Sequence, residues 1–265
     1  MPDITATARA FTEARRGGRL LAGYPGTPPG DMATAYRIQD AAIESWPDTI
    51  GGWKVGRIPP PLEAQYGSDR LAGPIFRSNI REVADGAQAT LSAYAGGFAA
   101  IEAEFVAVIA RDAPAGQERW SLEQAAEMIA ELRIGLELAS SPLASINELG
   151  PAVTAADFGN NAGLVVGPAI AGWRERPLES LACEAFVDGV SVGKGGAFNL
   201  TGGPVRSVQF ILELTAARGR PLRAGQLIAT GQTTGIHAIE PGQSARVEFG
   251  EDGAVALVTT PFQED

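Results

Sequence analysis

The sequence predicts an α+β fold in which a mixed β-sheet is rolled into a distorted barrel and flanked by helices. Strand patterns follow one another with few helices between them, which is atypical of a doubly wound parallel sheet. Residues 101–110 form a strand pattern that turns apolar on both faces, as expected near the middle of a sheet. From residue 184 onwards, short alternating strands and turns dominate the chain.

The first fifty residues contain two helix patterns. Asp3 is a candidate N-cap, and apolar residues recur behind it at helical spacing until two glycines at 17 and 18. Asp31 is the candidate N-cap of a second helix, which ends before Pro47. We therefore predict an N-terminal helical unit over residues 1–50 and a β-roll catalytic domain over residues 51–265.

Residues 51–56 predict a short strand that places Trp53 and Val55 on one face and Lys54 on the other. The Pro- and Gly-rich segment 57–76 reads as a long loop with one helical turn. Loops of this length in a compact domain are often functional, so we expect it to cover a site.

A capping box formed by Ser121 and Gln124 predicts the start of the next helix, whose apolar stripe extends to Leu132. A strand at 134–139 follows, with Glu137 on the face opposite its apolar residues. An irregular passage from Pro142 then leads to a strand at 163–167.

The C-terminal part predicts a hairpin over 185–192 that turns at Asp188-Gly189. Pro204 begins a helix that Gly219 terminates. Strands are predicted at 226–230, 245–249 and 254–258.

Charge and composition exclude several classes of partner. The net charge is −10 and the isoelectric point is near 4.7, whereas nucleic acids and anionic membranes bind basic patches. No apolar run is long enough to span a bilayer, and residues 1–5 lack the features of a signal peptide. We expect a cytoplasmic protein whose ligands are small metabolites.

One cysteine, Cys183, and one histidine, His237, limit the chemistry further. They exclude an internal disulfide, a cysteine zinc site and a histidine-rich metal site. The segment 233–237 around the single histidine does not resemble a nucleophile elbow, which argues against a serine hydrolase. Any metal ion must be held mainly by oxygen.

Two glutamates on the 101–110 strand indicate where such an ion would bind. Glu102 and Glu104 share one face, and that face turns apolar directly after them. Two carboxylates 4 Å apart repel each other by roughly 4 kcal/mol at an effective dielectric constant near 20. A hard divalent cation between them would remove this repulsion. The alternative is that both side chains lie on a solvated sheet edge.

Seven segments of the chain form an ordered series: Ala35-Tyr36-Arg37-Ile38-Gln39, Gly52-Trp53-Lys54-Val55-Gly56, Ile101-Glu102-Ala103-Glu104, Leu136-Glu137-Leu138, Ala156-Asp157, Gly193-Lys194-Gly195 and Ile228-Ala229-Thr230-Gly231. Their order and spacing resemble the 2-keto-4-pentenoate hydratase and 4-oxalocrotonate decarboxylase group of the fumarylacetoacetate hydrolase superfamily. The resemblance covers nearly the whole chain and implies a β-roll core like the C-terminal domain of that superfamily.

The resemblance also implies a set of site residues. Glu102, Glu104 and Glu137 match the three carboxylates that hold Mg²⁺ or Mn²⁺. Lys54 and Asp157 match residues that position the substrate and move protons, and Thr234 matches a turn near the substrate. A lysine whose stem lies along the surface and an aspartate that caps a loop are the alternatives for Lys54 and Asp157.

The activity that the resemblance implies is hydration of 2-hydroxy-2,4-dienoates, from 2-hydroxypenta-2,4-dienoate to 4-hydroxy-2-oxopentanoate, in aromatic-ring catabolism. Decarboxylation of 2-oxo-3-hexenedioate (4-oxalocrotonate) is the alternative, since both reactions pass through an enolate of a 2-oxo acid. A non-catalytic oxo-acid-binding accessory subunit is a third hypothesis. The family implies a homo-oligomer and a possible complex with a related decarboxylase or hydratase.

Two departures from the family pattern are visible. Pro142 stands where the family usually has an arginine, after Ser140-Ser141. Residues 158–161 read Phe-Gly-Asn-Asn, where Asn-Ala-Ser is common. The loss of an arginine near the site could alter which carboxylate substrate is accepted.

Overall fold

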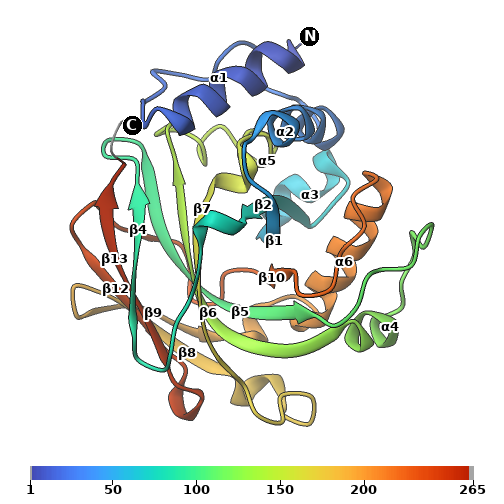
Figure 1. The fold of residues 1–265 in the computed structure, drawn as a ribbon, viewed down its shortest axis with the longest axis vertical. Coiled ribbons are helices and arrows are strands. Elements are labelled where there is room, and N and C mark those ends of the chain that lie inside the picture. The colour runs from blue at the N-terminus through green and yellow to red at the C-terminus, as the bar shows by residue number, and fades with distance from the viewer. Residues whose placement is uncertain (1, 263–265) are drawn as a thin grey trace.

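The computed structural model describes residues 2–262, which form an eight-stranded sheet and a five-stranded sheet with helices packed against them (Figure 1). The order of the larger sheet is β2-β1-β10-β5-β6-β7-β3, with β11 paired to β5, and that of the smaller sheet is β4-β13-β12-β8-β9. The helices are α1 (Ile4–Arg16), α2 (Met32–Ser45), α3 (Pro60–Tyr66), α4 (Leu122–Glu127), α5 (Pro151–Ala156) and α6 (Gly203–Ala217). The strands are β1 (Ile50–Arg57), β2 (Arg70–Phe76), β3 (Ile80–Glu82), β4 (Gln88–Ala93), β5 (Phe98–Ile109), β6 (Ile129–Ser141), β7 (Asn161–Ala169), β8 (Ala182–Val187), β9 (Val190–Gly196), β10 (Leu227–Ala229), β11 (His237–Ala238), β12 (Ser244–Glu248) and β13 (Ala254–Pro261).

The mixed pairing confirms the predicted α+β class with a curled sheet. β1 pairs with β10 in parallel, whereas β5, β6 and β7 are antiparallel neighbours. The long strands β5 and β6 curve through the centre of the molecule, and β8, β9, β12 and β13 lie on one side of them (Figure 1). Both faces of β5 are buried around its middle, as the sequence predicted.

The two N-terminal helices begin at the predicted N-cap residues. Asp3 accepts a hydrogen bond from the Ala6 amide, and Asp31 accepts one from the Thr34 amide. Gln39 of α2 donates to the carbonyl oxygens of Ala72 and Ala155, which fastens the helix to β2 and α5. Buried residues of α2 belong to the same hydrophobic cluster as those of β5 and β13. The division at residue 50 stays a prediction, and this shared core argues for close integration of the two parts.

The prediction of a long loop over 57–76 was wrong, because β2 occupies its second half and is buried throughout. Gly73 and Pro74 were part of the predicted loop, but Pro74 is opposite Trp53 on a strand that has a partner on one side only. A proline is tolerated on such an edge strand because no further neighbour needs its amide.

The helix predicted to extend from Ser121 towards Leu132 is shorter than expected. The capping box is present, but α4 ends at Glu127 and β6 begins at Ile129. Ile129 and Leu132 are therefore strand residues. A short apolar run fits a helix and a buried strand equally well, and here pairing with β5 decides the outcome.

The hairpin at 185–192, the helix from Pro204 and the three C-terminal strands are present as predicted. Val187 pairs with Val190 across the Asp188-Gly189 turn. Within residues 2–262, no helix combines the length and the apolar character needed to cross a bilayer.

Replacing Gly73 with Ala should lower the free energy of unfolding by about 1 to 3 kcal/mol, because the added methyl group would overlap the Phe158 carbonyl and push β2 away from the turn at Phe158. Urea unfolding measures the change. Gly30→Ala is the matched control, since its methyl group would meet nothing within 4 Å. Equal unfolding midpoints for Gly73→Ala and the wild type would contradict this close approach.

Candidate metal centre

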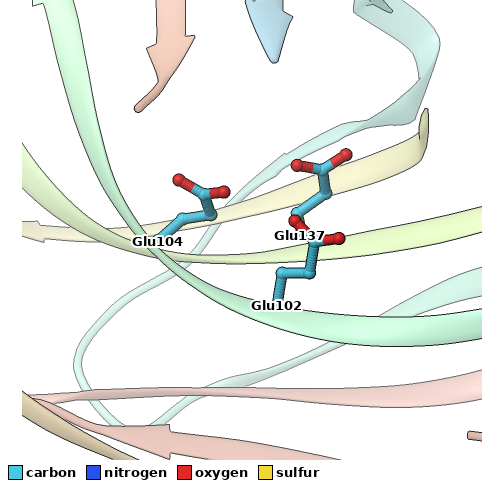
Figure 2. A group of neighbouring side chains, drawn as sticks. All are labelled: Glu102, Glu104 and Glu137. Atoms are coloured by element: carbon cyan, nitrogen blue, oxygen red, sulfur yellow. The ribbon is translucent and has the colours of Figure 1, made fainter. Parts of the chain in front are cut away.

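Two neighbouring strands bring three glutamates together (Figure 2). β5 carries Glu102 and Glu104, and β6 carries Glu137 directly opposite Glu102 in the antiparallel register. Side chains that are opposite each other across such a pair lie on the same face of the sheet. The three carboxylates point to the same side of the sheet, and one oxygen of each lies within 4.8 Å of the others.

Burial excludes the solvated-edge alternative for these side chains. Glu102 is 3% exposed, and Glu104 and Glu137 are fully buried. Three like charges taken out of water are costly unless they are paired or bind a metal ion. Among the described residues, Glu104 Oε1 and Glu137 Oε2 have no hydrogen-bond partner. These oxygens fit a divalent cation, since Mg²⁺ and related hard ions prefer oxygen ligands.

Lys54 places a positively charged ammonium group beside the three carboxylates. It projects from β1 and is 3% exposed, and its Nζ lies 3.4 Å from Glu137 Oε1 and 3.8 Å from Glu102 Oε2. Nζ also donates to Asn160 Oδ1 over 3.4 Å. The structure therefore excludes the surface-lysine alternative. One ammonium leaves the cluster of three carboxylates with an excess of negative charge.

The acidities of these groups follow from burial and crowding. Burial lowers the pKa of the Lys54 ammonium, but Glu102, Glu137 and Glu104 outweigh this effect, so the net shift is upward. Burial raises the pKa of Glu137 to about 7, although Lys54 and the Asn161 amide act in the opposite direction. Burial and the neighbouring carboxylates raise the pKa of Glu104 well above its usual range.

These shifts predict how metal binding and stability depend on pH. A carboxyl whose pKa is raised on folding stabilises the metal-free protein at acidic pH, and this contribution is lost as the pH rises from the unfolded value near 4.5 through about 7. Mg²⁺ should therefore raise the melting temperature more at pH 8 than at pH 5. Its apparent affinity should fall about tenfold per pH unit below 7 for each competing proton. Thermal unfolding with Mg²⁺ or EDTA measures the first effect, and equal Mg²⁺-induced shifts at both pH values would contradict it.

Asp157 does not join this cluster. Its carboxylate is bound by Arg15 of α1, with Nε and Nη2 at 2.5 and 2.9 Å, and by Ser141 Oγ at 2.6 Å. Because both of its carboxylate oxygens accept hydrogen bonds, Asp157 is suited to hold the neighbouring backbone segments in place. The acid/base role expected for Asp157 stays a prediction, and this geometry favours the loop-holding alternative.

Asn160 and Asn161 were not among the predicted site residues, yet they connect the segment after Asp157 to the carboxylate cluster. Asn161 Nδ2 donates to Glu137 Oε1 at 2.9 Å, and Asn160 accepts from Lys54. Phe158, Gly159 and Asn160 all have left-handed φ angles, of 55°, 66° and 57°. Such conformations cost about 1 to 3 kcal/mol each for residues other than glycine. The only indication in the sequence that these two asparagines matter was the unusual Phe-Gly-Asn-Asn run at residues 158–161.

A cavity of about 390 Å³ is lined by residues next to the cluster, although none of the three glutamates lines it directly. Gly231 lines the cavity, and its amide donates to Glu104 Oε2 at 2.7 Å. Thr234 also lines the cavity, and its Oγ1 lies 3.2 Å from Nε2 of the half-buried His237. Arg57, Glu63, Asp69 and Arg70 come from the segment that was expected to cover a site, and they form part of the wall.

Comparisons with known proteins identify relatives of this chain. One relative is a 2-keto-4-pentenoate hydratase from Burkholderia vietnamiensis (strain G4 / LMG 22486), 26% identical over 264 residues that cover 97% of this chain and 98% of the relative. Another is a 4-oxalocrotonate decarboxylase from a Pseudomonas species, 33% identical over 107 residues, or 40% of each chain.

Solved structures of 4-oxalocrotonate decarboxylase from Pseudomonas putida G7 share the fold. The complex with magnesium and adipate has a TM-score of 0.77 at 22% identity and covers 97% of both chains. The complex with calcium and acetate has a TM-score of 0.76 at 23% identity and covers 97% of this chain and 96% of the other.

The model of the fumarylacetoacetate (FAA) hydrolase C-terminal family matches residues 75–260, a stretch that contains all three clustered glutamates. The resemblance inferred from the sequence is thereby confirmed, and the chain belongs to this family of enzymes.

Proposed function

We propose that this protein is a divalent-metal-dependent lyase that acts on 2-oxo acids and their dienol tautomers, with Mg²⁺ or Mn²⁺ held by Glu102, Glu104 and Glu137. The buried cluster of three carboxylates with two unpartnered oxygens carries the proposal. When bound, the cation supplies a Lewis acid that stabilises negative charge on the 2-oxygen of the substrate. The relatives named as a hydratase and a decarboxylase support this class of chemistry.

The residues of the chain would share the remaining work. The Lys54 ammonium lies beside Glu102 and Glu137, where it can hold a proton for the reacting carbons or their attached oxygen. The 230–235 segment forms one wall for the rest of the substrate, with Thr234 as the proposed hydrogen-bonding contact. The backbone amides of Thr230 and Thr233 donate hydrogen bonds to carbonyl oxygens of β5, which hold this wall close to the carboxylates.

The leading reaction is hydration of 2-hydroxypenta-2,4-dienoate to 4-hydroxy-2-oxopentanoate. One relative that matches this chain over nearly its whole length is named as a hydratase, which supports this choice. The protein with Mg²⁺ should bleach the ultraviolet absorbance of the dienol and yield the hydroxy-oxo acid, and EDTA should stop the reaction. Unchanged absorbance over a panel of 2-hydroxy-2,4-dienoates would contradict the hydratase assignment.

Decarboxylation of 2-oxo-3-hexenedioate is the second candidate, and two arginines favour it. Arg57 and Arg70 line the cavity and could bind a second carboxylate at the far end of a dicarboxylate. Arg70 is already paired with Asp69, whereas Arg57 is exposed. Release of carbon dioxide from 2-oxo-3-hexenedioate, with no bleaching of the pentadienoate, would select the decarboxylase.

A further inference from the structure

We propose that the turn from Asp157 to Asn161, locked by Arg15 of α1, sets the positions of Glu137 and Lys54, so that Arg15 and Asn161 are positioning residues for the divalent cation. The inference rests on the metal site of the proposed function. It does not depend on which 2-oxo acid or dienoate is the substrate.

The turn has a backbone conformation that needs outside support. Phe158, Gly159 and Asn160 are consecutive and left-handed. Residues with a Cβ atom adopt this region only at a cost, and a run of three persists when surrounding contacts determine it. Glycine at position 159 also leaves room for Lys54. A Cβ atom at this position would lie only 3.0 Å from Lys54 Cδ.

The conformation brings two neighbouring side chains to one cluster. In a regular strand, Asn160 and Asn161 would point to opposite faces. Here Asn160 Oδ1 accepts from Lys54 Nζ at 3.4 Å, while Asn161 Nδ2 donates to Glu137 Oε1 at 2.9 Å. Both asparagines are at most 5% exposed. They orient the lysine and one carboxylate before any ligand binds.

Arg15 ties the two ends of the turn together. Besides its two bonds to the Asp157 carboxylate, it donates from Nη1 to the Asn161 carbonyl at 2.9 Å and from Nη2 to the Ser140 carbonyl at 3.2 Å. Its guanidinium group also lies 5.3 Å from the centre of the Phe158 ring. Arg15 is 5% exposed, so these contacts are shielded from water. A residue far from the glutamates in the sequence thus holds the segment that orients Glu137.

Calorimetric titration of the chain of residues 1–265 with MgCl₂, at a temperature where every variant is folded, tests the proposal. Arg15→Met and Asn161→Ala should each weaken Mg²⁺ binding by about tenfold or more, as is typical for residues that orient metal ligands. Arg16→Met is the matched control, because Arg16 is the next residue on the same helix and is exposed. It should bind Mg²⁺ as the wild type does.

A merely structural role predicts a different pattern. Leu257→Ala removes a fully buried side chain from the five-stranded sheet and destabilises the protein away from the turn. Its Mg²⁺ affinity should equal that of the wild type, and a loss equal to that of Arg15→Met would overturn the proposal. Arg15→Lys keeps the charge beside Asp157 and should recover part of the lost affinity.

Should Arg15→Met fail to fold, Asn161→Ala decides alone, because it leaves the Arg15 contacts to Asp157 in place. Wild-type Mg²⁺ affinity in Asn161→Ala would overturn the positioning role. The failure of the metal site itself gives a separate result, since the wild-type protein would then bind no Mg²⁺ at all.

Discussion

Replacing Glu104 with Gln should abolish divalent-metal binding and, at pH 8, make the metal-free protein more stable. The substitution would keep the shape of the side chain but remove one of three buried negative charges, and Lys54 compensates mainly Glu102 and Glu137. Without the Lewis acid, kcat/KM should fall by about a thousandfold or more, which corresponds to about 4 kcal/mol of lost transition-state stabilisation.

Calorimetric titration with Mg²⁺ or Mn²⁺ and urea unfolding with EDTA measure the two effects of Glu104→Gln. Glu248→Gln is the matched control, because Glu248 forms a surface ion pair with Arg246 and should affect neither quantity. The opposite signs of the two changes distinguish a functional charge from a structural one. Wild-type metal affinity in Glu104→Gln would contradict its role as a ligand.

Replacing Lys54 with Met should have the second largest effect. Removing the proton-holding group should lower kcat by about 10²- to 10⁴-fold. The metal-free protein should lose about 3 to 5 kcal/mol of stability, because Glu102 and Glu137 would be left buried without the Lys54 ammonium group that pairs with them. Mg²⁺ should restore part of this stability, and its affinity should not fall, since the site becomes more negative.

Lysine occurs only twice in the chain, which offers a clean control for Lys54→Met. Lys194 is exposed and pairs with Glu184 on the hairpin of β8 and β9. Lys194→Met should leave kcat and the unfolding midpoint unchanged. A kcat for Lys54→Met within twofold of the wild type, with Mg²⁺ bound, would exclude a role in proton transfer.

Alternation along the chain predicted part of the carboxylate cluster. Glu102 and Glu104 share a face of β5 by period alone, and the resemblance to the family added Glu137 and Lys54. The helix caps at Asp3, Asp31 and Ser121 were also found, because capping depends on local sequence. These features need little knowledge of distant contacts.

The remaining features depend on contacts that no local pattern encodes. β2 is stable because it pairs with β1 and packs against the turn at Phe158, despite containing Gly73-Pro74. Arg15 reads as an ordinary arginine at a helix end, yet it is buried against Asp157, a residue 142 positions further along the chain. The role expected for Asp157 was therefore assigned without knowledge of its main partner.

Anomalous diffraction at the manganese edge, from crystals grown with Mn²⁺, tests most directly whether Glu102, Glu104 and Glu137 hold one divalent cation. We expect a single strong peak within about 2.0 to 2.6 Å of an oxygen atom of each glutamate. The unpartnered oxygens Glu104 Oε1 and Glu137 Oε2 should be among its ligands. A manganese peak elsewhere, with these carboxylates unliganded, would contradict the metal centre and the chemistry proposed for it.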